Sequence, residues 1–357
     1  GMNRLRTSFQ QTTGQISGHG KRNVGVLKTA FAAVADEMAS DQYGTGAIIE
    51  PFEQKFADVL GMDDAVFFPS GTMAQQVALR IWSDETDNRT VAYHPLCHLE
   101  IHEQDGLKEL HPIETILVGA ADRLMTLDEI KALPDIACLL LELPQREIGG
   151  VAPAFSELET ISRYCRERGI RLHLDGARLF EMLPYYEKTA AEIAGLFDSI
   201  YISFYKGLGG IAGAILAGPA AFCQTARIWK RRYGGDLISL YPYIVSADYY
   251  YELRKDRMGQ YYEQAKQLAE QFNALPGVHT TPEVPVSNMF HLHFDGQAAD
   301  ISPKLEQVQE ETGLGFVGYL VDKDGYCSTE ISVGDAYGEL DQQTRDAGFA
   351  RLRQAFS

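Results

Sequence analysis

The chain has 357 residues, of which 45% are hydrophobic and 23% are charged, and its formal net charge at pH 7 is −17. This length is sufficient for two domains, and the composition is that of a globular protein. The negative charge argues against nucleic acid and anionic membrane surfaces as the main partners. No stretch approaches the roughly 18 apolar residues of a membrane-spanning helix, and the N-terminus lacks the apolar core of a signal peptide. The five cysteines are scattered without a CxxC pair, so we expect reduced thiols in a cytoplasmic protein.

The first part of the chain is predicted to form two helices, followed by a strand, a turn and a third helix. Residues 1–25 are polar and rich in glycine, which favours an arm or loop. Apolar residues recur at helical spacing in residues 24–38 and again in residues 49–60. A short strand is predicted at residues 65–68, and a helical pattern begins at Met73.

The turn before this third helix is a candidate anion site. It contains Ser70, Gly71 and Thr72, whose backbone N–H groups and hydroxyls lie at the start of the predicted helix. A helix N-terminus presents unpaired N–H groups to an anion, so these residues could hold a phosphate. Ser70 and Thr72 are equally explained as helix caps, and this alternative stays open.

Strand and helix patterns alternate from about residue 60 to residue 220, which predicts an α/β domain with a mostly parallel sheet. Strands are predicted at residues 90–93, 113–118, 137–143, 170–174, 200–204 and 211–216, and helices at residues 126–133, 155–168, 179–183 and 220–232.

The C-terminal part has a different pattern. Helices are predicted at residues 241–258, 261–272, 303–312 and 340–356, and strands at residues 286–294 and 326–333. Short strands mixed with helices predict a smaller α+β domain. We therefore predict an N-terminal arm and helix over residues 1–45, a large domain over residues 46–245 and a small C-terminal domain over residues 246–357.

A histidine-containing loop and a predicted helix follow the strand at residues 90–93. His98 and His102 are four residues apart and would share one helix face, close to the carboxyl group of Glu103. This spacing occurs in metal sites, but the sequence has no evident third cluster of ligands, so we predict no metal. An alternative use of His98 is to stack its imidazole on a flat ligand.

Three ionisable side chains follow predicted buried strands. Asp175 comes directly after the strand at residues 170–174, and Arg178 lies one helical turn further on. Lys206 follows the strand at residues 200–204 and precedes a glycine-rich stretch. A lysine that is removed from water has a lowered pKa, and its amine can then attack a carbonyl. Taken singly, a surface lysine and a capping aspartate are the ordinary explanations.

Taken together, these groups are what a protein supplies to pyridoxal 5′-phosphate (PLP). They are a phosphate site, a carboxylate for the pyridinium nitrogen and a lysine for the Schiff base. All three lie at the carboxyl ends of predicted strands, where open α/β sheets bind their ligands. The sequence therefore predicts PLP as the cofactor.

The sequence also resembles the threonine aldolases and aromatic amino acid β-eliminating lyases, which are PLP-dependent enzymes with the aspartate aminotransferase fold (fold type I). The matching segments are residues 67–74, 173–179, 198–199 and 206–209, with a looser match at Tyr43, Gly44 and Glu53. The resemblance implies a homodimer or homotetramer whose active sites are completed across the dimer interface.

The same resemblance implies the residues that bind the cofactor. Lys206 would form the Schiff base, and Asp175 would pair with the ring nitrogen. The turn at residues 70–72 would hold the phosphate, and His98 would stack on the ring. Ser203 is a further candidate for cofactor binding.

The substrate side of the site departs from the family pattern. The segment with a histidine that usually follows Glu142 is replaced here by residues 143–146, so the resemblance does not identify the catalytic base. His98 and Glu103 are the favoured candidates for the base, and Gln145 acting through a water and the phosphate itself are the others.

The candidates for substrate binding are Arg178, Arg146, Gln145 and Tyr43. The resemblance places Arg178 near the ring oxygen and the substrate carboxylate. Arg146 would replace a carboxylate-binding arginine that has no clear counterpart near the C-terminus. A salt-bridged surface arginine explains Arg146 equally well.

The favoured function is cleavage of the Cα–Cβ bond of a β-hydroxy-α-amino acid such as threonine or allo-threonine, which gives glycine and an aldehyde. The alternatives are β-elimination or transamination of another amino acid, and a protein that binds a small molecule without catalysis. The pair of Lys206 and Asp175 argues against the last alternative, because a binding protein does not need a Schiff base.

Overall fold

The structure is a computed structural model that describes residues 3–357, and in it the chain divides into two compact units. The large unit consists of residues 23–147 and 152–256. The small unit consists of the described residues up to Arg22, residues 148–151 and residues 257–357. The boundary predicted at residue 245 lies inside a helix of the large unit, and along the sequence the large unit ends at Asp256.

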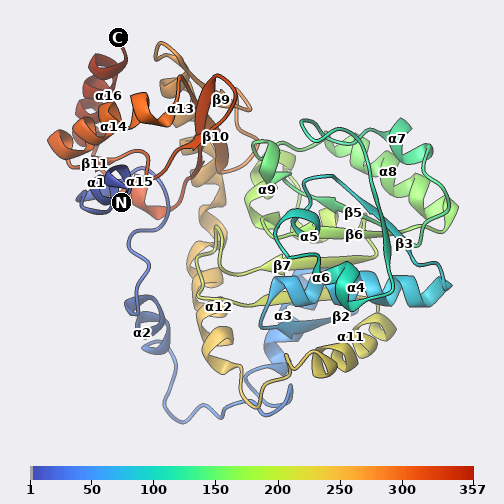
Figure 1. The fold of residues 1–357 in the computed structure, drawn as a ribbon. Coiled ribbons are helices and arrows are strands. Elements are labelled where there is room, and N and C mark those ends of the chain that lie inside the picture. The colour runs from blue at the N-terminus through green and yellow to red at the C-terminus, as the bar shows by residue number, and fades with distance from the viewer. Residues whose placement is uncertain (1–2) are drawn as a thin grey trace. The chain divides into compact units, whose positions relative to one another are not determined.

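The large unit is built around a sheet of seven strands in the order β2-β8-β7-β6-β5-β3-β4 (Figure 1). The strands are β2 (Asp64–Phe68), β3 (Thr90–Tyr93), β4 (Glu114–Leu117), β5 (Cys138–Glu142), β6 (Arg171–Gly176), β7 (Ser199–Ser203) and β8 (Ala214–Gly218). Strand β8 runs antiparallel to both of its neighbours, and the other pairs are parallel. The prediction of an α/β domain with a mostly parallel sheet is confirmed.

Helices of the large unit surround this sheet or, like α2, pack on another helix. They are α2 (Gly25–Phe31), α3 (Glu50–Leu60), α4 (Gly71–Thr86), α5 (His98–Ile101), α6 (Gly106–Leu110), α7 (Leu127–Lys131), α8 (Phe155–Arg168), α9 (Leu179–Tyr186), α10 (Ala190–Ala194), α11 (Ala220–Arg232) and α12 (Tyr241–Arg254). Helix α4 packs across strands β2, β3 and β5–β8, and α11 packs beside it. The stacked rings of Trp82 and Phe222 join these two helices in the core.

The small unit combines a four-stranded antiparallel sheet with helices. The sheet consists of β9 (Val278–Thr281), β10 (Met289–Asp295), β12 (Val321–Asp322) and β13 (Tyr326–Ser332), and a separate parallel pair is formed by β1 (Gly14–Gln15) and β11 (Leu314–Gly315). The helices of this unit are α1 (Arg4–Gln10), α13 (Met258–Asn273), α14 (Ala298–Thr312), α15 (Asp335–Glu339) and α16 (Gln342–Phe356). Short 3₁₀ turns lie at Arg146–Ile148 and Lys255–Arg257. Within residues 3–357, no helix is long and apolar enough to cross a membrane.

Two predictions for the N-terminal part are wrong. The predicted arm contains helix α1, because the Asn3 side chain caps the N–H of Leu5 at 3.0 Å and Leu5 is buried. The predicted helix at residues 24–38 ends at Phe31. Beyond it, Val34 packs against the buried side chains of Val245 and Tyr250 from a turn, so tertiary packing overrides helix propensity there.

The outer edge of strand β2 is held by a buried carboxylate. Glu53 on α3 accepts a hydrogen bond from the N–H of Phe67 at 2.7 Å. Its other oxygen accepts from Nη2 of Arg227 at 3.4 Å, and Nη1 of the same arginine donates to Asp64 at 2.6 Å. An edge strand needs partners for the N–H groups that face away from the sheet. Glu53 therefore joins α3, β2 and α11 through one side chain.

Replacing Glu53 by leucine should lower the free energy of unfolding by about 2–4 kcal/mol, because the Phe67 N–H and the Arg227 guanidinium lose a buried acceptor. Urea unfolding followed by circular dichroism measures this change. Glu53→Gln keeps an oxygen for the N–H and should cost less. Equal unfolding midpoints for the wild type and Glu53→Leu would contradict the assignment.

Candidate active site

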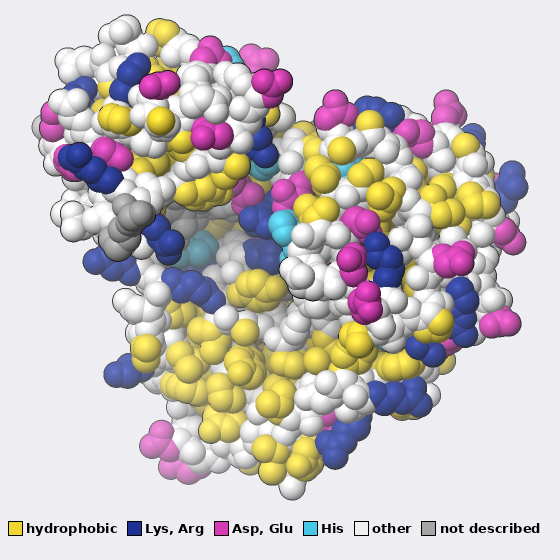
Figure 2. Space-filling model, viewed as in Figure 1, with side chains coloured by type: hydrophobic (Ala, Val, Ile, Leu, Met, Phe, Trp, Pro, Cys, Tyr) yellow, Lys and Arg dark blue, Asp and Glu magenta, His cyan; other side chains and the backbone are white. Residues whose placement is uncertain are grey.

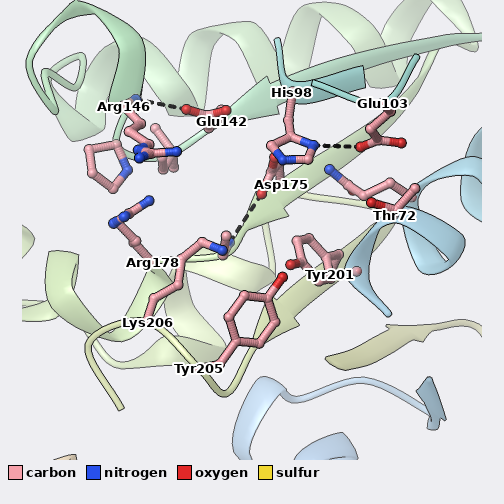
Figure 3. Close-up of a pocket in the computed structure, with 15 residues that line it drawn as sticks. Thr72, His98, Glu103, Glu142, Arg146, Asp175, Arg178, Tyr201, Tyr205 and Lys206 are labelled. Carbon is pink, nitrogen blue, oxygen red and sulfur yellow. Dashed lines mark hydrogen bonds and ion pairs between the residues drawn. The ribbon is translucent and has the colours of Figure 1, made fainter. Parts of the chain in front are cut away.

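A pocket lies at the carboxyl ends of β5, β6 and β7 (Figure 3). It is lined by Gly71, Thr72, Gln75, His98, Glu103, Glu142, Leu143, Pro144, Arg146, Asp175, Ala177, Arg178, Tyr201, Tyr205 and Lys206. These residues all belong to the large unit. The parallel strands deliver their last residues to one edge of the sheet, which is where open α/β sheets bind ligands.

The N-terminus of α4 forms one wall of the pocket. Ser70 caps the helix by accepting a hydrogen bond from the N–H of Met73 at 3.4 Å. The N–H groups of Gly71 and Thr72 lie in the first turn, where a helix offers no carbonyl partner. A Cβ atom on Gly71 would overlap the ring of Tyr201, so only glycine allows the helix to start this close to β7. The result is a cradle of backbone donors that suits an anion.

Two carboxyl groups lie side by side on neighbouring strands. Glu142 ends β5 and Asp175 lies near the end of β6, and the parallel register pairs these two residues directly. Asp175 accepts from the N–H of Ala177 at 3.1 Å, and Glu142 accepts from the N–H of Arg146 at 2.7 Å. Burial raises the pKa of both carboxyls, and the like charge of Asp175 raises the pKa of Glu142 further.

Lys206 reaches the pocket from the loop after β7. Burial, and then the positive charge of Arg178, lower the pKa of Lys206 to about 8, although Asp175 acts in the opposite direction. The Nζ atom also lies 4.2 Å from the centre of the Tyr205 ring. A lysine with this pKa is about one-tenth neutral at pH 7, whereas an ordinary lysine is neutral in roughly one molecule in three thousand. The structure therefore supplies a reactive amine.

His98 and Glu103 form a hydrogen-bonded pair on the other side of the pocket. His98 Nδ1 lies 2.6 Å from Glu103 Oε2, and the Glu103 side chain is almost fully buried. The predicted helix that would carry both histidines on one face is not formed, because α5 ends at Ile101 and Gln104 and Asp105 adopt positive φ angles. This turn carries the Glu103 carboxylate back towards His98.

The structure brings together eight of the twelve residues predicted for the site. Those that line the pocket are Gly71, Thr72, His98, Glu103, Arg146, Asp175, Arg178 and Lys206. Ser70, Gln145 and Ser203 do not line it, although Gln145 Nε2 donates to Glu142 at 3.5 Å. Tyr43 lies elsewhere on the large unit, where its exposed ring packs against the guanidinium of Arg231 at 4.6 Å.

Seven residues that line the pocket were not among the predicted site residues, namely Gln75, Glu142, Leu143, Pro144, Ala177, Tyr201 and Tyr205. Glu142 lines the pocket, and an acid at the end of an apolar strand was the available signal for it. Gln75 and Tyr201 also line the pocket, but both look like ordinary core positions in the sequence. Glu181 is buried beside Gly207, and burial raises its pKa to about 7. Nothing in the sequence separates it from a surface acid of helix α9.

The structure also describes the histidines that were considered as metal ligands. His102 Nε2 pairs with Glu147 Oε1 at 2.8 Å, while His98 pairs with Glu103. Over residues 3–357, no group of three or more His, Cys, Asp or Glu side chains is arranged to hold a metal ion.

The pocket fits PLP on the chemistry of its donors. The N-terminus of α4 offers N–H groups for a phosphate, and Gly71 places no side chain over them. Asp175 offers a buried carboxylate for a pyridinium N–H, and Lys206 offers an amine of lowered pKa for an aldehyde. His98 offers an imidazole ring close to Asp175 (Figure 3).

In the cofactor-free protein, the reaction of Lys206 with an amine-selective reagent should become about ten-fold faster between pH 7 and pH 9, because the neutral fraction of an amine of pKa 8 rises from roughly a tenth to nine-tenths. Peptide mass spectrometry measures the modification at Lys206. Arg178→Gln removes a positive charge that lowers the pKa, so it should slow the reaction at pH 7.5. Arg163→Gln on the exposed face of α8 is the control. A rate at Lys206 that keeps rising above pH 9, as for an exposed lysine, would contradict the prediction.

Comparisons with known proteins identify the family of the chain. The model of the Beta-eliminating lyase family matches residues 27–295. The low specificity L-threonine aldolase of Escherichia coli (strain K12) is 29% identical over 249 residues, which are 67% of this chain and 73% of that protein.

Two solved structures are similar over nearly the whole chain. One is a Listeria monocytogenes protein proposed to be an L-allo-threonine aldolase, with 59% identity, a TM-score of 0.98 and coverage of 99% of both chains. The other is the threonine aldolase of Leishmania major, with 19% identity, a TM-score of 0.74 and coverage of 96% of this chain and all of that chain. The second likeness shows the fold alone.

These similarities confirm the predicted fold, the predicted lyase class and the PLP cofactor. The family match covers the helix α4 cradle, Asp175 and Lys206, and it ends within β10. The chain belongs to the beta-eliminating lyase family.

Proposed function

We propose that this enzyme cleaves the Cα–Cβ bond of threonine or allo-threonine and releases glycine and acetaldehyde. The observation that carries the proposal is the placement of Lys206, Asp175 and the α4 N-terminus around one pocket. The named relatives support the substrate, since threonine aldolases occur among both the sequence and the structural matches.

The cofactor supplies an electron sink for the charge that remains on Cα when the bond breaks. The protein would hold it with the N–H groups of Gly71 and Thr72 at the phosphate and with the Asp175 carboxylate at the ring nitrogen. A buried, ionised Asp175 keeps a proton on that nitrogen, because a carboxylate favours the charged form of its partner. Lys206 Nζ accepts and returns a proton near neutral pH because its pKa is about 8.

The substrate would be held by positive side chains. Arg178 lines the pocket and is our candidate for binding the substrate carboxylate, with Arg146 beside it in the segment after Glu142. His98 is the candidate for removing the proton of the β-hydroxyl group, and Glu103 orients its ring at 2.6 Å. Gln145 belongs to the same segment, its side chain is buried, and it would act by holding Glu142 in place.

We also propose that the enzyme is a homo-oligomer in the cytoplasm, with sites completed between subunits. All five cysteines are buried thiols, as suits a reducing compartment. An apolar hollow of about 630 Å³ lies between α2, α3 and α12, and Figure 2 shows apolar side chains gathered over this region. Apolar patches of this kind mark protein interfaces.

Tyr43 is the candidate for a residue donated to a neighbouring subunit. It has a positive φ of 45°, which is strained for a tyrosine, and its side chain is exposed. The turn around it is fixed, since both carboxylate oxygens of Asp41 accept from the N–H groups of Leu240 and Tyr241. A strained, exposed and well-anchored aromatic ring suits contact with a ligand outside its own subunit.

The purified enzyme should release acetaldehyde from L-threonine or L-allo-threonine, and Lys206→Ala should abolish both this release and the visible absorbance of the bound cofactor. Coupled reduction of acetaldehyde measures the first, and a spectrum measures the second. Formation of pyruvate or another keto acid from a panel of amino acids, with no acetaldehyde from either substrate, would favour β-elimination or transamination instead.

If Tyr43 acts in the neighbouring subunit, mixing inactive Lys206→Ala with a weakly active Tyr43→Phe variant should restore activity. Random exchange in a dimer makes half of the molecules mixed, and each mixed dimer has one site with both residues intact. We therefore expect about a quarter of the wild-type activity per site. Activity no higher than the average of the two variants would show that Tyr43 does not act across an interface.

A further inference from the structure

The His98–Glu103 pair is the end of a longer chain of hydrogen-bonded side chains. Glu103 Oε1 accepts from Gln76 Nε2 at 3.0 Å, and Gln76 Oε1 accepts from the Tyr233 hydroxyl at 3.0 Å. The Tyr233 hydroxyl also bonds to Nε2 of His111. Gln76, Glu103 and His111 are each at most 8% exposed, so these bonds are shielded from water.

The chain of hydrogen bonds continues from His111 to the C-terminal part of helix α4. His111 Nδ1 lies 3.3 Å from Arg80 Nη1, and Arg80 Nε bonds to both carboxylate oxygens of Asp84 at 3.0 and 3.1 Å. Gln76, Arg80 and Asp84 are spaced by four residues and therefore share one face of α4. The same helix carries the anion cradle at its N-terminus. Helix α4 thus carries both the anion cradle and three of the residues in this chain of hydrogen bonds.

The chemistry of each group gives these bonds a single direction. Arginine can only donate, so His111 Nδ1 accepts and His111 carries its proton on Nε2. This agrees with the pKa of His111, which burial and then the charge of Arg80 lower to about 4. His111 Nε2–H donates to the Tyr233 oxygen, and the Tyr233 hydroxyl then donates its one proton to Gln76.

The direction is fixed at the other end as well. An ionised Glu103 can only accept, so Gln76 must present its amide N–H₂ to Glu103 and its oxygen to Tyr233. A flipped Gln76 would place its oxygen against the carboxylate. With one Glu103 oxygen taken by Gln76, the other accepts from Nδ1–H of His98.

We propose that Gln76, Tyr233, His111 and Arg80 are positioning residues that keep Glu103 as the acceptor of His98 Nδ1–H, so that His98 gains and loses protons only at Nε2. The proposal deepens the proposed function, because it names the nitrogen through which His98 would act as a base. It rests on that function for its kinetic consequence and not for the state of the His98 ring.

The glycine at the start of α6 supports this assignment. A Cβ atom on Gly106 would lie 2.5 Å from Gln76 Nε2, at the atom that donates to Glu103. A methyl group there would displace the amide from the carboxylate. Gly106 therefore leaves room for the one orientation of Gln76 that completes the chain.

The test is the tautomer of His98, read by ¹⁵N–¹H NMR of histidine-labelled enzyme with the cofactor bound and after its removal. His98→Asn assigns the signals. In the wild type, neutral His98 should show a protonated Nδ1 and an unprotonated Nε2. Gln76→Leu and Gly106→Ala should each add the signals of the other tautomer, since Glu103 loses its second donor. Tyr233→Phe should have the same effect to a smaller extent.

The kinetic consequence separates positioning from binding. Gln76→Leu should lower kcat about ten-fold and change KM less than two-fold, because general-base catalysis depends on the correct tautomer. Tyr186→Phe is the matched control. It removes a tyrosine hydroxyl that donates to the carbonyl of Pro153 at 2.7 Å, with no link to the chain from Arg80 to His98. The control should leave both kcat and the His98 signals unchanged.

An unchanged His98 tautomer in Gln76→Leu, Gly106→Ala and Tyr233→Phe would overturn the proposal, whatever the kinetics. Thermal unfolding of each variant identifies any loss of fold, and the three independent variants keep the test valid if one of them fails to fold. If the tautomer changes as expected but the wild type cleaves neither threonine nor allo-threonine, the proposed function fails and the positioning role stands.

Discussion

The removal of charged groups from water at the carboxyl ends of three parallel strands is the constraint on which the site depends. The register of β5 and β6 places Glu142 directly beside Asp175, and burial raises the pKa of both carboxyls. Two adjacent buried carboxyls are costly unless positive charge faces them. Lys206 and Arg178 supply that charge, and this is why the pocket draws together an amine, a guanidinium and two acids. The perturbed pKa of Lys206 is therefore a consequence of the fold, and not of the lysine alone.

Local signals explain which parts of the fold could be predicted. The C-terminal end of helix α8 is predicted correctly from the sequence, because Gly169 ends it with a φ of 71°. The longer helix predicted around His98 and His102 is not formed, because Gln104 and Asp105 take left-handed conformations that the sequence pattern does not predict. The division of the chain into two units depends on contacts that a local pattern does not carry. The N-terminal residues pair with β11 and pack on α14, some 300 positions later in the chain, and no local pattern records such a contact.

The same distinction holds for the site. Predicting the strands is enough to place Asp175, Lys206 and the turn before α4 close together, because all of them lie at strand ends. The chain from Arg80 to His98 cannot be found in that way. Gln76 and Tyr233 are 157 residues apart, and each looks like an ordinary core or cap residue in the sequence. The pairing of Glu103 with His98 was missed as well, since it needs the unpredicted turn after α5.

The contact between Gly71 and Tyr201 has a consequence for how the two halves of the cofactor site can vary. The space that a side chain at position 71 would take is filled by the phenol ring of β7. The anion cradle and the strand that leads to Lys206 are thus in direct contact, with no layer between them that could absorb a shift. A larger residue at position 71 is compatible with this architecture only together with a smaller one at position 201. The two positions are expected to change as a pair among relatives, although they lie on different elements and neither performs chemistry by itself.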